Sequence, residues 1–155
     1  MVENNFGKMM GFSCIKRQEE ETICEVDVTK DMLNPFNAIH GGVLFALSDE
    51  ACGYMCSLFY KMPVTLNSTF NYLRPAINNK KLIAKVNVVK KGKTICVLEV
   101  NVYDENDLCL CNGTFTYMEI KKWAVQLYSS ITILLLFLTR TTYLSGDNTN
   151  NHRNS

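Results

Sequence analysis

The sequence predicts an α+β domain in which one long helix is inserted early into an antiparallel sheet. Apolar and polar residues alternate in several stretches that tight turns separate, which is typical of antiparallel strands. One stretch, residues 40–56, shows no alternation and is almost continuously apolar or small, which is typical of a buried helix. We therefore expect the sheet to wrap around one central helix.

The strands are expected in a simple order along the chain. They cover residues 12–16, 23–28, 65–73, 82–88, 96–102 and 108–120. The acidic run 19–21 is interpreted as the turn between the first two strands, and residues 31–42, with Pro35 and two asparagines, as a loop. Residues 91–93 and 104–107 form the later hairpin turns.

Length and composition predict one globular domain over residues 1–122. The chain has 155 residues, of which 47% are apolar and 20% charged, so it can bury a core of its own. A formal net charge of +1, without a basic helix or arm, gives no electrostatic reason to bind nucleic acid. Residues 1–8 lack the apolar run of a leader peptide, so we expect a cytoplasmic protein, and we expect no cofactor.

Seven cysteines, an odd number, lie mostly inside apolar stretches. We interpret them as reduced thiols that fill the core of a cytosolic protein. The pairs Cys52-x3-Cys56 and Cys109-x-Cys111 do not have the spacing of zinc fingers or ribbons, and His40 is the one histidine that the domain could add. We therefore expect no metal site.

Residues 123–155 form a C-terminal tail of different composition. Residues 123–138 are almost wholly apolar, and residues 145–155 are polar and rich in asparagine, which is typical of a disordered end. As a helix, the apolar run would span about 24 Å, short of the roughly 30 Å hydrocarbon core of a bilayer. A membrane tail, an added docking helix and a non-native extension all stay open. Membrane contact is expected only through residues 123–144.

The predicted helix carries two acids, Asp49 and Glu50, and has no polar face on which to hold them. Carboxylates are almost never fully buried without partners. Either this edge of the helix reaches solvent or a salt bridge, or the apolar surroundings tune an acid for catalysis. Adjacent helical residues point about 100° apart, so we expect at most one acid to face a given pocket. Asp49 lies on the stripe of glycines and small residues, which a ligand or second subunit can approach closely.

Gly41 and Gly42 leave backbone N–H groups uncovered at the start of the helix. Such donors can stabilise a developing oxyanion at the positive end of the helix dipole, although packing or loop geometry also explains a Gly-Gly pair. The helix start and Asp49 lie about 13 Å apart, so one carbonyl cannot contact both. Two such helices side by side and antiparallel would bring the acid of one to the start of the other. The geometry therefore predicts a dimer with shared sites.

Four short motifs follow one another along the chain: Met32-Leu33-Asn34, His40-Gly41-Gly42, Leu47-Ser48-Asp49 and Leu73-Arg74-Pro75-Ala76. A loop asparagine, an HGG and an acid nine residues after the histidine form a specific combination. Through these motifs, residues 5–120 resemble the hotdog-fold thioesterases of the phenylacetate-degradation (PaaI-like) type. The resemblance implies a hotdog fold, hydrolysis of acyl-CoA thioesters, and a homodimer or dimer of dimers.

The resemblance also implies roles for single residues. Asn34 matches the loop asparagine that contacts the thioester carbonyl, and His40 matches the histidine beside it. Gly41 matches the glycine whose N–H polarises that carbonyl, and Asp49 the catalytic carboxylate from the opposite subunit. Thr65 matches a Ser/Thr position that orients water or the acid. Asp49 would then act as general base or as nucleophile, and the sequence does not choose between them.

Each of these residues also has a structural interpretation. Asn34 could simply turn its loop, with Asn37 as a less favoured stand-in at the site. His40 could form a hydrogen bond at the helix entry without touching substrate. Thr65 could be an ordinary strand residue, and Glu50 is interpreted as structural.

The residues that we expect to bind substrate are Gly42, Arg74, Lys90 and Lys91. The three basic residues lie at strand ends, where they could meet the phosphates of coenzyme A, as could Lys93. Lysines beside a hairpin are often only solvated. Three aromatic residues could line the pocket for the acyl group, although such residues are more often part of the core. They are Phe45, Tyr54 and Phe70.

Two other classes of function compete with a thioester hydrolase. A hotdog module that binds acyl-CoA without catalysis needs no carboxylate near the thioester, so Asp49 argues against it. A hotdog dehydratase or hydratase would need a different arrangement of His and Asp. The leading prediction is therefore an acyl-CoA thioesterase.

Overall fold

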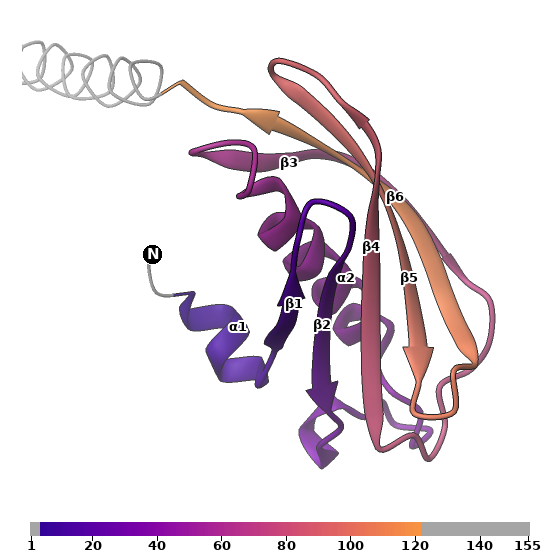
Figure 1. Ribbon diagram of the computed structural model, residues 1–155. Coiled ribbons are helices and arrows are strands. Elements are labelled where there is room, and N and C mark those ends of the chain that lie inside the picture. Colours follow the sequence, from indigo (N-terminus) through magenta and orange to yellow (C-terminus); the bar gives the residue numbers. More distant parts are fainter. Residues whose placement is uncertain (1–3, 122–155) are drawn as a thin grey trace, which may run out of the picture. The chain divides into compact units, whose positions relative to one another are not determined.

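The computed structural model describes residues 4–121 (Figure 1). The helical elements are α1 (Asn5–Met10), the 3-10 turn η1 (Lys30–Met32) and α2 (Gly41–Cys56). The strands are β1 (Ser13–Arg17), β2 (Thr22–Asp27), β3 (Pro63–Tyr72), β4 (Lys81–Lys91), β5 (Ile95–Asp104) and β6 (Cys109–Glu119). All six expected strands and the expected long helix are present.

One antiparallel sheet contains all six strands in the order β1-β2-β4-β5-β6-β3. The sheet curves around α2, which contacts every strand (Figure 1). The predicted α+β fold, a sheet wrapped around one long helix, is confirmed. Because β1 and β3 are the edge strands, each pairs with a single neighbour in the chain.

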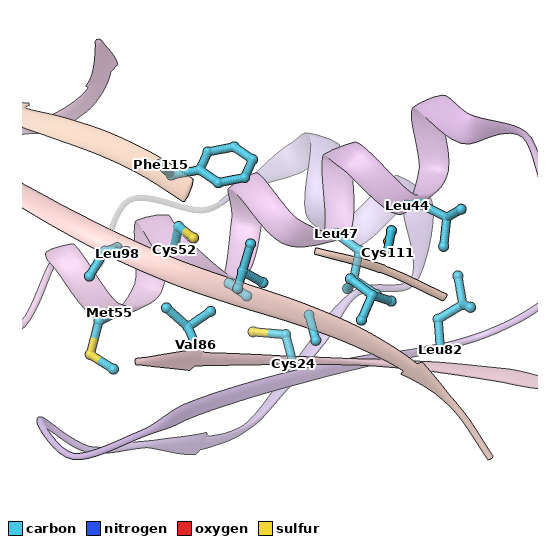
Figure 2. Packing of buried hydrophobic residues seen from close by; sticks show 14 of the residues in the cluster. Cys24, Leu44, Leu47, Cys52, Met55, Leu82, Val86, Leu98, Cys111 and Phe115 are labelled. Atoms are coloured by element: carbon cyan, nitrogen blue, oxygen red, sulfur yellow. The ribbon is translucent and has the colours of Figure 1, made fainter. Parts of the chain in front are cut away.

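The core lies between α2 and the inner face of the sheet. Every second residue of the central strands points inward, and these side chains meet the apolar helix (Figure 2). The fully buried set includes Leu47, Met55, Leu82, Val86, Leu98, Val100, Val102 and Phe115. Burying one such side chain contributes roughly 1.5–3 kcal/mol. The helix lacks a polar face because the sheet curves around it.

The seven cysteines are free thiols, and five of them are buried in this core. Figure 2 shows Cys24, Cys52 and Cys111 among the core side chains. Burial raises the pKa of the Cys111 thiol to about 12, with the nearby Cys109 as a further cause. This thiol stays protonated at neutral pH and packs as a small apolar group, in keeping with the interpretation drawn from the sequence.

The helix α1 was not predicted from the sequence. It has six residues, and its ends are held by local hydrogen bonds rather than by an apolar stripe. The Asn4 side chain accepts from the Gly7 N–H, and Gly11 ends the helix with φ 74°, a conformation that glycine adopts without strain. Such a short helix gives no readable periodicity.

Within residues 4–121, no helix is long and apolar enough to span a membrane. In the same part of the chain, no group of three or more His, Cys, Asp or Glu side chains is placed to hold a metal ion. The tail 123–155 lies outside the described residues, so its three possible interpretations stay open. The domain boundary at residue 122 stays a prediction.

Candidate functional site

Asp49 lies in the middle of α2, half-buried, and its carboxylate has two hydroxyl partners. The Thr65 hydroxyl of β3 donates to Asp49 Oδ1 at 2.7 Å. The Tyr117 hydroxyl of β6 lies 2.7 Å from the same Oδ1 and 2.7 Å from the main-chain oxygen of Asp49. The sheet thus supplies the polar partners that the helix lacks.

The register of the sheet brings the two hydroxyls together. Thr65 and Tyr117 are direct partners across the β3–β6 ladder, and a register shift follows between Thr65 and Asn67. Directly opposite side chains have Cβ atoms about 4.5–5.5 Å apart, so both can reach one atom. Burial, and then the charge of Asp49, raise the pKa of Tyr117 well above its usual range. The phenol therefore remains a protonated donor.

A cleft of about 680 Å³ opens beside this carboxylate. It is lined by Asn4, Asp49, Glu50, Gly53, Tyr54, Ser57, Pro63, Val64, Thr65 and Tyr117. Both neighbouring acids thus face one cleft, and the expectation that only one of them could do so is wrong. The cleft is wide enough to span two adjacent rows of helix side chains.

Glu50 and Tyr54 border this cleft, whereas the other two aromatic residues considered for the acyl group do not. Glu50 accepts a hydrogen bond of 2.5 Å from the Asn4 side chain, which ties α2 to the start of α1. Tyr54 lines the cleft. Phe45 and Phe70 instead pack against each other, with ring centroids 5.4 Å apart, and both also contact Phe115. Only one of the three aromatic residues considered for the acyl group therefore borders the space beside Asp49.

The start of α2 is capped by His40. Its Nδ1 accepts from the Gly42 N–H at 2.9 Å, so His40 acts at the helix entry. A Cβ on residue 42 would lie 2.9 Å from that nitrogen, which explains why a glycine stands there. The Tyr72 hydroxyl donates to the Gly41 carbonyl at 3.0 Å. Within residues 4–121, the Gly41 N–H meets no acceptor.

Asn34 turns the loop that leads into α2. Its Oδ1 accepts from the backbone N–H groups of Phe36 at 2.9 Å and Ala38 at 3.1 Å. The side-chain amide Nδ2 is therefore the atom left to donate to a ligand. Asn37, the less favoured stand-in, has a positive φ of 59° and lines a separate pocket with Lys30.

A second groove of about 300 Å³ lies at this end of the helix. It is lined by Asn34, Ala38, Ile39, Gly41, Leu44, Tyr72, Leu73, Arg74, Pro75 and Ala76. The predicted carbonyl-binding residues Asn34 and Gly41 thus meet in one groove, whereas Asp49 and Thr65 meet in the other cleft. One chain contains two separate halves of the predicted site.

The predicted phosphate-binding residues are also divided between the two ends of the sheet. Arg74 borders the groove at the helix start and donates to the Cys109 carbonyl at 2.7 Å. Lys90 and Lys91 end β4. Lys91 pairs with Cys96 of β5, and Cys96 pairs with Tyr117 of β6, so Lys91 lies at the Tyr117 end of the sheet. The Lys91 ammonium lies 3.7 Å from a Glu19 carboxylate oxygen. One chain does not bring these three basic residues together.

Tyr117 is the residue of this site that the sequence did not reveal as functional. The strand 108–120 was predicted, but the alternation that predicts a strand does not say which element an inward hydroxyl will meet. One signal was available. Tyr117 shares the inward face of β6 with Phe115, where a phenol must find a hydrogen-bond partner.

Comparison with known proteins identifies the family. Residues 36–111 match the Thioesterase superfamily. The acyl-coenzyme A thioesterase PaaI of Escherichia coli is 31% identical over 106 residues, which cover 68% of this chain and 76% of that protein. The chain belongs to the thioesterase superfamily. The predicted hotdog-fold, PaaI-like type and the predicted class of thioester hydrolase are thereby confirmed.

Two solved structures of thioesterase-superfamily type extend the comparison. The E. coli PaaI protein from the phenylacetic acid degradation operon aligns with a TM-score of 0.73 and 26% identity, covering 76% of this chain and 86% of that one. A hypothetical thioesterase protein of Streptococcus pneumoniae TIGR4, solved with coenzyme A, aligns with a TM-score of 0.64 and 29% identity. That alignment covers 69% of this chain and 84% of the other.

Proposed function

We propose that this protein hydrolyses acyl-CoA thioesters to the free acid and CoA, with Asp49 as the catalytic carboxylate. The observation that carries the proposal is the Asp49 carboxylate, held by Thr65 and Tyr117 at the wall of a cleft. An acyl-CoA substrate is supported by the name of the E. coli relative and by the coenzyme A in the S. pneumoniae structure.

In this proposal the start of α2 binds the thioester carbonyl. The Gly41 N–H and the Asn34 amide both border the same groove, and the helix dipole adds positive potential there. As the carbonyl carbon is attacked, its oxygen gains negative charge, which these donors offset. His40 contributes indirectly, because its bond to Gly42 fixes the first turn of the helix.

The active site would be shared between two subunits. Gly41 and Asp49 are eight residues apart in one helix, which is about 12 Å, whereas both must reach one reacting carbonyl, Asp49 either directly or through one water. An antiparallel homodimer, alone or within a dimer of dimers, would bring Asp49 of one chain to Gly41 of the other. The edge strand β3 supports such an association, because one of its backbone edges is unpaired in the described residues and its Val64 and Leu66 side chains are exposed.

The same arrangement would reunite the basic residues. In an antiparallel dimer, the end of the sheet with Lys90 and Lys91 would face the partner's helix start, where Arg74 borders the groove. These side chains would then flank one site and could contact the phosphates of coenzyme A.

A cytoplasmic location is supported by the seven free thiols.

Two chemical routes use the same residues. In one, Asp49 removes a proton from water as the water oxygen bonds to the carbonyl carbon, and the C–S bond then breaks to release the CoA thiolate. In the other, Asp49 attacks the carbonyl carbon, releases the thiolate and forms an anhydride that water cleaves. Label found in Asp49 after a single turnover in heavy-oxygen water would establish the second route, because water that cleaves the anhydride at the Asp49 carbonyl leaves its oxygen there and the first route never labels Asp49.

The function is tested by a thiol-release assay over short, medium, long and aromatic acyl-CoAs. We expect the protein to release CoA from at least one of them. Release from none, by a folded protein that binds acyl-CoA, would contradict hydrolysis and support a binding module instead.

A further inference from the structure

Both hydroxyl donors at Asp49 converge on a single carboxylate oxygen. The Thr65 and Tyr117 hydroxyls each lie 2.7 Å from Oδ1. Within residues 4–121, Oδ2 accepts no hydrogen bond. The carboxylate is therefore fixed by one oxygen, and the other is left for chemistry in the cleft.

The Tyr117 hydroxyl has one proton but two acceptors. It lies 2.7 Å from Asp49 Oδ1 and also 2.7 Å from the Asp49 main-chain oxygen. A charged carboxylate oxygen is the stronger acceptor, so the proton points to Oδ1 while Asp49 is ionised. When Asp49 becomes neutral, by taking a proton or by acylation, rotation of the O–H bond redirects the proton to the main-chain oxygen. The ring need not move.

We propose that Tyr117 is a positioning residue that holds the ionised form of Asp49 and directs Oδ2 toward the substrate. The proposal rests on the function proposed above. Thr65 acts on the same oxygen from the exposed side of the cleft, whereas Tyr117 acts from the core, where it is 3% exposed. A second difference is that the Tyr117 hydroxyl has another acceptor at the same distance, the Asp49 main-chain oxygen.

The surroundings of the phenol fit this role. Burial, followed by the charge of Asp49, raises the pKa of Tyr117, so the phenol remains a donor at neutral pH. A Cβ on Gly53 would lie 3.6 Å from its oxygen, an ordinary contact distance. The hydroxyl thus lies between the core and the floor of the cleft.

The test is the variant Tyr117→Phe, which keeps the ring and removes the hydroxyl. We expect kcat to fall roughly 10- to 100-fold, the range of a hydrogen bond to a charged group, with KM within about threefold of its original value. The matched control is Tyr60→Phe. Tyr60 is 8% exposed and donates to the Gly92 carbonyl at 2.9 Å, away from the cleft, so this variant should keep kcat within about twofold.

Two further measurements separate positioning from a merely structural role. In an Asp49→Asn background, Tyr117→Phe should change the residual rate by less than about twofold, because the charge on which it acts is gone. Replacing Tyr117 by 4-aminophenylalanine, which keeps a donor at the same ring position, should restore most of kcat; this variant also serves if Tyr117→Phe fails to fold.

The outcomes distinguish this proposal from the function on which it rests. If the original protein releases thiol but Tyr117→Phe does so at the same rate, the positioning role is wrong and the hydrolase stands. An equal loss in Tyr60→Phe, or an undiminished loss in the Asp49→Asn background, would also overturn it. If the original protein releases no thiol, the proposed function itself fails.

Discussion

At the scale of single residues, the proposed chemistry depends on Asp49, the acid in the middle of the helix. Asp49→Asn keeps the shape of the side chain and an Oδ1 that can still accept from Thr65 and Tyr117. The fold and dimer should therefore persist, while loss of the charged oxygen should lower kcat by about 10²- to 10⁴-fold. Thiol release measures the rate, and sedimentation measures the dimer. A variant with near-full turnover of every acyl-CoA tested would remove Asp49 from the mechanism.

In the other half of the proposed site, Asn34 also allows a substitution that changes one function of the side chain and keeps the other. Asn34→Asp keeps the oxygen that holds the Phe36 and Ala38 amides but replaces the donating NH₂ group by a charged oxygen. We expect the thermal midpoint to hold within a few degrees, while kcat falls roughly 10²- to 10³-fold, as for loss of an oxyanion donor.

The control for this substitution is Asn37→Asp. Asn37 belongs to the same loop but lines a different pocket, so turnover should hardly change. If Asn34→Asp and Asn37→Asp lose the same modest amount, Asn34 is only a loop residue.

The residues of the site could be predicted to different degrees. Asn34, Gly41 and Asp49 stand out because their spacing is specific and because an acid in an apolar helix needs a partner. The partners themselves could not be assigned, since Tyr117 reaches Asp49 from 68 residues away. Periodicity gives the face on which a side chain lies, but the opposing atom depends on sheet register and on the position of the helix.

At the scale of elements, the site depends on how closely β3 is held to β6. A Cβ on Gly113 of β6 would lie 2.7 Å from Phe70 Cδ2 and 2.7 Å from the Thr69 main-chain oxygen. Because one of these atoms is backbone, Gly113→Ala must displace β3, at a cost of about 1–3 kcal/mol in free energy of unfolding. Activity should fall as well, because β3 carries Thr65.

The control is Gly53→Ala. Its new Cβ would have no neighbour closer than 3.6 Å, and alanine favours a helix over glycine by roughly 0.5–1 kcal/mol. Urea unfolding of both variants provides the measurement. Equal or higher stability of Gly113→Ala would mean that β3 can move aside at no cost.

The elements themselves follow from the sequence more readily than their contacts do. Alternation over 82–88 and 96–102 marks the two strands that form the centre of the sheet. Both are longer in the structure, because the ladder continues through residues 89–91 of β4 and through Ile95, Tyr103 and Asp104 of β5. The helix α1 escapes prediction because it is stabilised by Asn4 and Gly11 at its ends, not by an apolar face. Short elements of this kind depend on capping and on tertiary contacts, here the bond between Asn4 and Glu50.

At the scale of the whole molecule, one chain separates the two groups of residues that are proposed to act on one carbonyl. Asp49, Thr65 and Tyr117 border one cleft, and Asn34 and Gly41 border the other groove. The sequence already predicted this separation, because helix geometry alone sets the distance between Gly41 and Asp49. How two chains associate depends on surfaces that no local pattern encodes.

A mixing experiment tests the shared site. Asp49→Asn and Asn34→Asp are each expected to be nearly inactive alone, since every site of either homodimer lacks one half. After the two are unfolded together and refolded in equal amounts, half of the dimers should contain one chain of each kind. Each such dimer would have one intact site, from Asp49 of one chain and Asn34 of the other, and one site with both defects. Activity should therefore return to roughly a quarter of that of the original protein.

Refolding each variant separately before mixing should give no recovery as long as the dimers do not exchange chains. Absence of recovery after joint refolding, with mixed dimers demonstrated by two affinity tags, would mean that each chain completes its own site.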